Sequence, residues 1–355
     1  MSNITIISNE KNWIEQTAIN QLEALANLPG VVQTVGLPDL HAGKSPVGAV
    51  VVSEDVIYPH IVGGDIGCGM GLYDTGIESR KFKLDRWVTK LSNIRELADI
   101  QTDNPYEEPS PIYDLGTIGG GNHFVEFQVV DKIYDKEVCM ALQLDEAMLM
   151  LLVHSGSRGY GQSILNTYDN PQGLAADDEQ VECYLTEHDN AVLWAARNRK
   201  IVVNKLLAYL GYTPRPKKLI DCQHNFIERR GDRFIHRKGA VSAERGPIII
   251  PGSRGSLTYV VEPTKNTAMA AFSLSHGAGR KWARSLCKSR IRNKYDRDTI
   301  RQTKLKSRVV CHDTDLLFQE APEAYKNIDT VIDSLLQFEL INVVATLRPV
   351  LTYKG

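Results

Sequence analysis

The chain has 355 residues, of which 43% are hydrophobic and 24% are charged, and its formal net charge is −2. This length permits one large domain or two of ordinary size. The sequence shows no basic N-terminal region followed by an apolar run, and no stretch approaching the roughly 18 consecutive apolar residues of a membrane helix. Its six cysteines include no Cys-x-x-Cys pair and do not resemble a disulfide framework. We therefore expect a cytoplasmic protein that neither spans a membrane nor is secreted.

Apolar residues recur at spacings of three and four in several segments, and this pattern predicts helices. The segments are 13–28, 84–100, 136–149, 181–210, 279–295 and 321–338. Runs of β-branched residues predict strands at 47–52, 151–153, 219–221, 248–250 and 259–261. Because strands and helices do not alternate regularly, we expect an α+β fold, with a single large mixed α/β domain over residues 1–355. The Pro-rich acidic stretch 103–113 is expected to be a flexible loop.

Basic residues are concentrated in one part of the chain. Residues 280–308 contain twelve Lys and Arg and two Asp, a local net charge of +10, so the remainder carries about −12. Such asymmetry favours a face that binds a polyanion. A solvated basic helix without a partner explains the same charge run equally well, so the charge pattern alone leaves both interpretations open.

Several glycine-rich segments each carry a side chain that can bind a metal or act as a nucleophile. They are residues 63–70 (GGDIGCGM), 116–126 (GTIGGGNHFVE), 154–159 (HSGSRG), 223–225 (QHN) and 275–280 (SHGAGR). Glycine permits positive φ and lets backbone N–H groups approach a ligand closely, which suits loops that surround a phosphate. One such segment would be a weak signal, but their joint occurrence indicates a binding site.

The donor atoms in these segments are typical of a metal centre. Asp65 and Cys68 place a hard oxygen and a soft sulfur within one tight turn, so a thiolate could bridge two ions while the carboxylate reaches one. Three histidines lie beside small residues at the ends of expected strands or loops, namely His123, His154 and His224. Together the five donors could hold a binuclear centre.

Other histidines and cysteines have simpler interpretations. A lone histidine is more often a satisfied polar residue than a ligand, and we keep that interpretation for His60, His188, His236 and His312. His41 stays open because residues 38–43 (PDLHAG) form another compact polar turn. Three cysteines in helical patterns are expected to be small buried hydrophobic residues: Cys139, Cys183 and Cys287. The Gly-Lys-Ser at 43–45 is no P-loop, since Pro38 stands where that motif requires glycine.

Taken in order, these motifs and the Lys-Gly at 354–355 resemble the RtcB family of RNA ligases. The resemblance runs from about residue 37 to residue 355. It implies GTP-dependent joining of an RNA 3′-phosphate or 2′,3′-cyclic phosphate end to a 5′-hydroxyl end, with two Mn²⁺ ions, in a single catalytic domain. Cysteine and imidazole ligands would by themselves suggest Zn²⁺ at least as strongly, so the choice of Mn²⁺ rests on the resemblance.

The resemblance also implies roles for individual residues. Cys68 would bridge the two ions, one held also by Asp65 and His123 and the other by His154 and His224. His276 would be the nucleophile that becomes guanylylated. The residues implied in GTP binding are Asn122, Glu126, Arg158, Asn225, Ser253, Thr258, Arg280, Tyr325 and Lys354.

The chain is short for this family, and the segment between His224 and the turn 251–253 looks abbreviated. We therefore expect a short variant that repairs cut ribosomal or transfer RNA, as in relatives associated with a release-factor-like partner; an activating protein is a further expected partner. Two other functions fit parts of the sequence. One is a metal-dependent phosphodiesterase or phosphatase that processes RNA ends without joining them, and the other is a non-catalytic RNA-binding or ribosome-associated protein.

Overall fold

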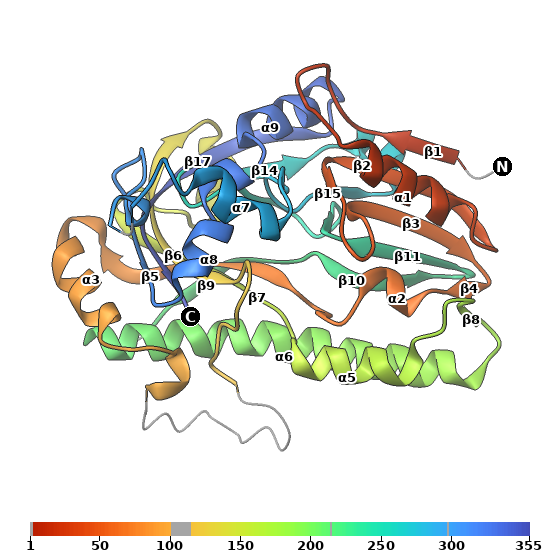
Figure 1. Ribbon diagram of the computed structural model, residues 1–355, viewed down its shortest axis with the longest axis horizontal. Coiled ribbons are helices and arrows are strands. Elements are labelled where there is room, and N and C mark those ends of the chain that lie inside the picture. Colours follow the sequence, from red (N-terminus) through yellow and green to blue (C-terminus); the bar gives the residue numbers. More distant parts are fainter. Residues whose placement is uncertain (1–2, 101–114, 214, 297) are drawn as a thin grey trace.

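The computed structural model describes residues 3–100, 115–213, 215–296 and 298–355, so the expected flexible stretch 103–113 lies outside the described residues. Two β-sheets form its centre (Figure 1). The five-stranded sheet has the order β1 (Asn3–Ile6), β2 (Val31–His41), β3 (Val47–Glu54), β11 (Arg233–Lys238) and β10 (Asn225–Arg230). The eight-stranded sheet has the order β13 (Ile248–Pro251), β14 (Thr258–Pro263), β17 (Ile341–Lys354), β6 (Phe124–Ile133), β7 (Met148–Ser155), β5 (Gly69–Glu78) and β9 (Lys217–Gln223), with β16 (Arg308–Cys311) parallel to β17.

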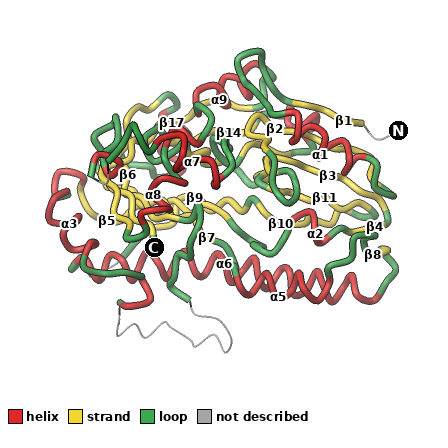
Figure 2. Tube along the Cα trace, viewed as in Figure 1, coloured by secondary structure: helices red, strands yellow, loops and turns green. Residues whose placement is uncertain are grey.

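Helices surround these sheets (Figure 2). The α-helices are α1 (Gln16–Ala26), α2 (Pro59–Val62), α3 (Leu84–Ser92), α4 (Lys136–Leu142), α5 (Gly159–Tyr168), α6 (Glu179–Leu210), α7 (Arg284–Ile291), α8 (Thr314–Gln319) and α9 (Ile328–Gln337). The 3-10 helices are η1 (Ser79–Lys81), η2 (Leu97–Asp99), η3 (Lys265–Ala270), η4 (Thr299–Arg301) and η5 (Pro322–Ala324). Two strand pairs complete the described elements, β12 (Ala240–Ser242) with β15 (Ser273–Ser275) and β4 (Val56–Ile57) with β8 (Leu174–Ala175).

Strand β7 is buried on both faces. Met150 and Leu152 belong to the core on one side of the sheet, whereas Leu149, Leu151 and Val153 belong to the core on the other. Successive side chains of a strand point to opposite faces, so a strand covered on both sides reads as an unbroken apolar run. This explains why residues 148–153 are all hydrophobic although the sheet is antiparallel.

Four neighbouring strands bring distant parts of the chain to one end of the eight-stranded sheet. His123 precedes β6, Cys68 precedes β5, and His224 follows β9. His154 lies near the end of β7, where it pairs with Phe124 of β6 and Met70 of β5. Because β5 is antiparallel to both β7 and β9, the first residues of β5 lie beside the last residues of its neighbours. The sheet topology therefore places these four side chains at one sheet end.

The long helix α6 holds the loops at this end from below (Figure 1). The Asp178 carboxylate accepts from the Gln180 N–H at its N-terminus, and Gly211 ends it with a φ of 92°. In the middle of α6, the Asn198 side chain accepts from the Gly116 N–H and donates to the Thr117 carbonyl. Arg199 donates to the Gly67 and Ser155 carbonyls at 3.1 and 2.8 Å. These contacts tie α6 to the segments that carry Cys68 and His154.

The expected α+β class is confirmed, and the structure is one large domain of mixed helices and sheets. Every predicted strand lies inside an observed one, and the helix predicted at 181–210 is α6 with two more residues. Other helix predictions were too long. The segment 136–149 was wrong beyond Leu142, because Met148 already begins β7, and the segment 279–295 is helical only in α7. Gly279 has a φ of 69° and Arg280 pairs with Tyr325 as a β-bridge, so neither can belong to a helix.

None of the helices in the described ranges is both long enough and apolar enough to cross a membrane. The longest of them, α6, buries one side against the sheet and keeps charged residues on the other.

The buried ion pair between α6 and β9 yields a prediction about stability. The side chain of Arg199 is fully buried and that of Asp221 is 8% exposed, with 2.9 Å between Arg199 Nε and Asp221 Oδ1. Arg199→Met leaves a buried carboxylate without its partner, which costs about 3–5 kcal/mol. Urea denaturation should show this loss, whereas Lys200→Met, at an exposed neighbouring position, should change stability by less than about 0.5 kcal/mol. Equal stability of both variants would contradict this role of the pair.

Candidate metal centre and nucleotide pocket

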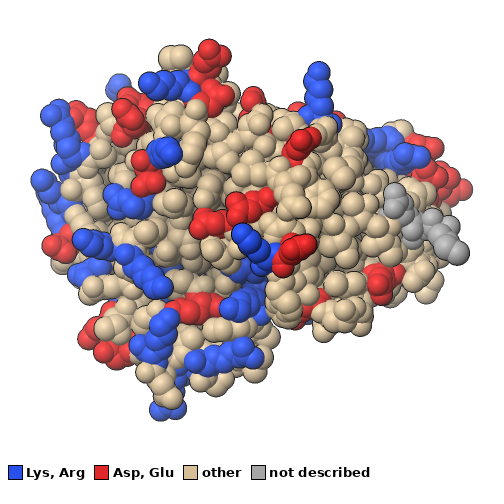
Figure 3. Space-filling view, turned by 90° about the horizontal axis from the view of Figure 1, so that it is seen from above, with Lys and Arg blue, Asp and Glu red and all other residues tan. Residues whose placement is uncertain are grey.

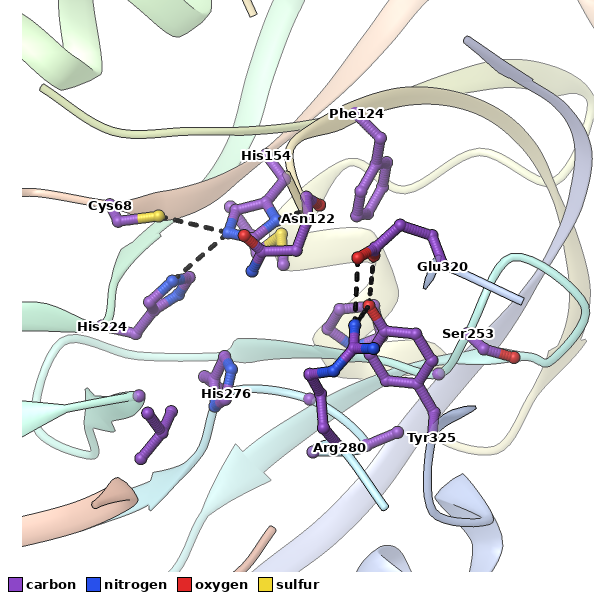
Figure 4. Close-up of a pocket in the computed structure, with 18 of the residues that line it drawn as sticks. Cys68, Asn122, Phe124, His154, His224, Ser253, His276, Arg280, Glu320 and Tyr325 are labelled. Atoms are coloured by element: carbon purple, nitrogen blue, oxygen red, sulfur yellow. Dashed lines mark hydrogen bonds and ion pairs between the residues drawn. The ribbon is translucent and has the colours of Figure 1, made fainter. Parts of the chain in front are cut away.

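The segments singled out in the sequence meet at a cavity of about 360 Å³, within the usual range for a small-molecule site. Cys68, His154 and His224 lie at one end, His276 lies beside them, and Glu320 and Tyr325 lie at the other end (Figure 4). Most of the residues predicted for the site line this cavity: Asp65, Cys68, Asn122, Glu126, His154, His224, Asn225, Ser253, His276, Arg280, Tyr325 and Lys354. Strands of both large sheets and the turns after them supply its wall.

Two groups of donor atoms share Cys68. In the first, His123 Nε2 lies 3.0 Å from Asp65 Oδ2 and 3.4 Å from Cys68 Sγ. In the second, His154 Nε2 lies 3.2 Å from Cys68 Sγ and 3.3 Å from His224 Nε2. Each group could hold one metal ion. Ligands bound to a common ion at about 2.0–2.3 Å lie roughly 3–4 Å apart, so these separations fit coordination.

The electrostatics of the cluster also fit metal ions. Burial holds the pKa values of His154 and His224 well below the ordinary value, which keeps both imidazoles neutral, as metal ligands must be. Burial, with Asp65 beside it, raises the pKa of the Cys68 thiol well above its ordinary value. A thiolate at Cys68 therefore requires a cation next to the sulfur, and a bound metal ion supplies that charge. The donor set accepts Zn²⁺ as readily as Mn²⁺.

Hydrogen bonds orient two of these side chains, those of His154 and Asp65. His154 Nδ1 lies 3.2 Å from the Asn122 carbonyl, which turns Nε2 toward Cys68. The Arg158 backbone N–H donates to Asp65 Oδ1 at 2.9 Å, and the Asn225 amide donates to the Asp65 carbonyl at 3.3 Å. Partners that occupy the remaining polar atoms of ligands are typical of metal sites, because they restrict the direction in which each ligand points.

His276 lies next to the cluster and is oriented by a buried carboxylate. Its Nδ1 lies 2.6 Å from Asp39 Oδ2, and its backbone N–H donates to the same oxygen at 3.2 Å. The rings of His276 and His224 have centroids 4.8 Å apart. Burial acts to raise the pKa of Asp39, but His276 outweighs it and holds that pKa below its ordinary value. An ionised Asp39 facing Nδ1 leaves the lone pair of the neutral ring on Nε2.

A buried carboxylate and its partners form one wall away from the metal centre. Glu126 Oε2 accepts from the Thr352 hydroxyl at 2.6 Å, and Oε1 accepts from the Gln128 amide at 2.7 Å. The same Gln128 amide reaches Thr258 at 2.8 Å. Burial raises the pKa of Glu126 to about 7. Its protonation state therefore changes near neutral pH, and the carboxylate form can accept hydrogen bonds from a ligand.

The far end of the cavity is organised around Glu320. Arg280 donates to Glu320 Oε1 at 3.0 Å, and the Tyr325 hydroxyl donates to Oε2 (Figure 4). Lys354 Nζ lies 3.8 Å from the same Oε2. Lys354 also donates to the His123 carbonyl at 3.0 Å and is almost fully buried, although it is followed by only one residue in the sequence. Lys354 is the final residue of β17, and this strand pairs with β14, β16 and β6, which holds the end of the strand in the sheet.

Three predicted residues are absent from the cavity lining: His123, Arg158 and Thr258. His123 belongs to the first donor group, and Thr258 lies behind Glu126 as a partner of Gln128. Arg158 immediately precedes α5 and lines a neighbouring cavity, with its guanidinium 5.5 Å from the centroid of the Trp194 ring.

Sequence reasoning missed three charged residues of the cavity wall, Lys238, Arg254 and Glu320. It also missed Asp39, which does not line the cavity but contacts His276, which does. The polar segment 38–43, noted for His41, was a signal for Asp39, but the prediction that it forms a compact turn was wrong, because residues 38–41 belong to strand β2. Lys238 is half-buried and donates to the Val62 carbonyl, and desolvation lowers its pKa against the opposing effect of Asp65 and Cys68. In the sequence, Lys238 and Glu320 cannot be told apart from ordinary charged surface residues, so sequence reasoning could not have found them.

The residues given simpler interpretations lie largely as expected. His236 Nε2 accepts from the Tyr58 N–H at 2.8 Å, and His188 Nε2 accepts from the Ile227 N–H at 3.0 Å. His41, left open, lines the cavity with Nδ1 2.8 Å from the Asp39 carbonyl. Cys139 and Cys287 are buried, but the prediction for Cys183 was wrong, because this residue lies on the exposed side of α6.

Comparison with known proteins agrees with this arrangement. The family model described as tRNA-splicing ligase RtcB matches residues 21–98 and 95–355. The chain is 43% identical to the RNA-splicing ligase RtcB2 of Escherichia coli strain ATCC 25922, over 98% of the chain and 95% of that protein. It is 30% identical to the RNA-splicing ligase RtcB of Escherichia coli K12, over 96% of the chain and 95% of the relative. A more distant relative is the tRNA-splicing ligase RtcB of Archaeoglobus fulgidus, with 27% identity over 96% of the chain and 92% of that protein. The extent of these matches shows that the chain belongs to the RtcB family.

Proposed function

We propose that this protein is an RNA ligase that joins an RNA 3′-phosphate or 2′,3′-cyclic phosphate end to a 5′-hydroxyl end, with GTP and two Mn²⁺ ions. Residues 1–355 act as one catalytic domain. The observation that carries the proposal is the placement of His276 beside two donor groups that share Cys68, within one cavity. Family membership supports ligase chemistry on RNA.

One ion would be held by Asp65, Cys68 and His123, and the other by Cys68, His154 and His224. When bound, the ions would act as Lewis acids that polarise phosphate oxygens. The choice of Mn²⁺ over Zn²⁺ follows the family resemblance.

His276 is the proposed nucleophile. Asp39 holds the Nδ1 side of the ring, so Nε2 carries the lone pair that faces the cavity. Nε2 attacks the α-phosphorus of GTP, a bond forms between nitrogen and phosphorus, and the bond to pyrophosphate breaks. The guanylyl group then passes to the RNA 3′-phosphate, which becomes an activated electrophile. The 5′-hydroxyl oxygen attacks that phosphorus and GMP leaves; a cyclic phosphate is first hydrolysed to a 3′-phosphate in the same cavity.

The end of the cavity away from the metal centre suits a guanine base. Glu126 offers an acceptor for the base N–H groups, Tyr325 offers a ring for stacking, and Ser253 and Lys354 lie on the same wall. Asn122 and Asn225 lie near the metal donors, where phosphates would bind. Arg158 and Thr258 would contribute to GTP binding indirectly. Arg158 contacts Asp65, and Thr258 contacts Gln128, the partner of Glu126.

RNA reaches the cavity across a basic surface. Arg284 lines the cavity at the start of α7, and Lys281, Arg290 and Arg292 are exposed beside it. Seen from above, Lys and Arg side chains gather on the left half of the molecule, which contains α7 (Figures 1 and 3). Cationic side chains that neutralise phosphates make RNA binding weaker as salt rises.

The proposed role is repair of cut RNA. The chain is 43% identical to RtcB2 but 29% identical to RtcB1 of the same Escherichia coli strain, so it resembles the first of these two relatives more. As in the short relatives with a release-factor-like partner, we expect a partner protein that delivers broken ribosomal or transfer RNA.

The covalent step is tested with α-³²P-GTP and Mn²⁺, followed by denaturation and detection of label on the chain. Wild type should carry label, and His276→Ala should reduce it by more than about a thousandfold, since it removes the attacking atom. Cys68→Ala should lose both label and bound metal, whereas Cys183→Ala, at an exposed cysteine, should keep both. Wild type that binds metal but carries no label would instead support an end-processing phosphodiesterase.

GTP binding should depend on pH through Glu126. Its pKa is raised to about 7, so the accepting carboxylate is fully present above that pH and is lost as pH falls through 7. Lys354 and Arg254 are the charged groups that oppose this rise in pKa. Affinity of the His276→Ala protein for GTP should fall about tenfold between pH 8 and pH 6. Glu126→Gln should bind more weakly at pH 8 and lose most of this dependence; an unchanged profile in that variant would rule out Glu126.

The role of the basic surface is tested by measuring RNA binding at several salt concentrations. Arg290→Gln combined with Arg292→Gln should weaken binding of nicked ribosomal RNA and lower the slope of log affinity against log salt by about 1–2. Lys11→Gln, at an exposed lysine outside this surface, should change neither the affinity nor its salt dependence.

A sealing assay tests the repair role. Wild type should seal nicked ribosomal RNA at least as fast as intron-cleaved tRNA halves. Much faster sealing of tRNA halves would contradict the repair role.

A further inference from the structure

Glu320 occupies an unusual position among the residues of the cavity. Its side chain is 4% exposed, and it contacts three residues assigned above to GTP binding, Arg280, Tyr325 and Lys354. It follows α8 and precedes η5, the turn that leads into Tyr325. Burial acts to raise its pKa, but Lys354 and Arg280 outweigh burial and hold the pKa below its ordinary value. Glu320 is therefore a buried carboxylate that only accepts hydrogen bonds.

The protonation states determine the direction of each hydrogen bond. Burial and Glu320 raise the pKa of Tyr325, so its hydroxyl keeps the proton and donates it to Glu320. Arg280 then donates through Nη1 to the Tyr325 oxygen at 3.2 Å and to Glu320 at 3.0 Å. The three groups form a closed triangle of hydrogen bonds at the hydroxyl end of the Tyr325 ring (Figure 4).

Arg280 has no donor left for a phosphate in this arrangement. A guanidinium has five N–H groups. Nε donates to the Trp282 carbonyl, Nη1 to Glu320 and Tyr325, and Nη2 to the Cys287 sulfur and the Gln319 carbonyl. Its guanidinium also covers one face of the Tyr325 ring, 5.1 Å from the centroid. Arg280 therefore supports the ring from one side, and the opposite face is the one that a base could stack on.

We propose that Glu320 is the positioning residue of the nucleotide pocket: through Arg280 and the Tyr325 hydroxyl it holds the tyrosine ring against the bound base. This inference rests on the proposed function, because it takes the base to be that of GTP. Glu320 itself need not touch the nucleotide. An amide in place of the carboxylate would offer one acceptor oxygen to two donors, so either Arg280 or the Tyr325 hydroxyl would face an NH2 group, and the ring would lose its single orientation.

The chain offers a matched control three residues away. Glu323 also follows α8, and its carboxylate accepts from Lys294 and, at 2.6 Å, from the Tyr295 hydroxyl. It therefore makes the same kinds of contact, to one cation and one tyrosine, but it does not line the cavity. Substitution of Glu323 tests the effect of losing such a network without disturbing Tyr325.

The experiment measures GTP dissociation constants by equilibrium dialysis in the full-length His276→Ala protein, which separates binding from reaction. Glu320→Gln should raise the dissociation constant about 10- to 100-fold, the range for loss of hydrogen bonds to a charged group. Glu323→Gln should change it less than about twofold. Tyr325→Phe removes the hydroxyl but keeps the ring. Glu320→Gln should therefore raise the dissociation constant much less in the Tyr325→Phe protein than in the protein that keeps the Tyr325 hydroxyl.

Several results would overturn the inference. An unchanged dissociation constant in Glu320→Gln would show that the carboxylate does not position the ring. An equal effect of Glu320→Gln with and without the Tyr325 hydroxyl would show that it acts by another route, and thermal unfolding of each variant would reveal a general loss of structure. Absence of GTP binding in the His276→Ala protein would remove the base site altogether. Failure of the proposed ligase chemistry is separate: wild type would then bind GTP in dialysis but carry no covalent label.

Discussion

The shared position of Cys68 is the constraint on which the rest of the structure depends. Its sulfur lies within 3.4 Å of a nitrogen atom of His154, in β7, and of His123, just before β6, and both donor groups contain it. A sulfur atom that belongs to both donor groups must lie between them. The neighbouring strands that bring the other donors must therefore have their ends beside the start of β5. The antiparallel order β6-β7-β5-β9 satisfies this requirement, because β5 lies between the strand that carries His154 and the strand that precedes His224.

Buried polar contacts maintain this arrangement from below. Asn198 and Arg199 of α6 bind the turns before His123, Cys68 and the end of β7. Such side chains are expensive to bury unless every donor finds an acceptor, and a fully paired network specifies one arrangement of the loops. The helix that lies along the lower edge of the molecule in Figure 1 is therefore bonded directly to the segments that carry the donor residues.

Charge is distributed differently at the two ends of the cavity. At the metal end, burial keeps His154 and His224 neutral and opposes ionisation of Cys68, so the donors suit a cation. At the other end, Glu126 and Glu320 face Lys354 and Arg254, and the two carboxylates differ. Glu320 is held ionised by Lys354 and Arg280, whereas Glu126 has a pKa near 7 and is free to respond to a ligand. The two carboxylates therefore differ in protonation behaviour, which fits the different roles proposed for them above.

The sequence by itself predicted the fold class and the donor residues that the structure brings together. Glycine-flanked Asp65, Cys68 and the three histidines are recognisable because loops around a ligand need glycine locally, and local requirements are visible in a sequence. The 14-residue strand β17 was missed, since Pro349 interrupts its pattern and its register shifts beside it. Only the tertiary structure decided that Asp39 faces His276, that Arg280 is bound to Glu320, and that Lys354 is buried. These contacts join residues far apart in the chain, and their partners are chosen by strand order and burial, which no local pattern encodes.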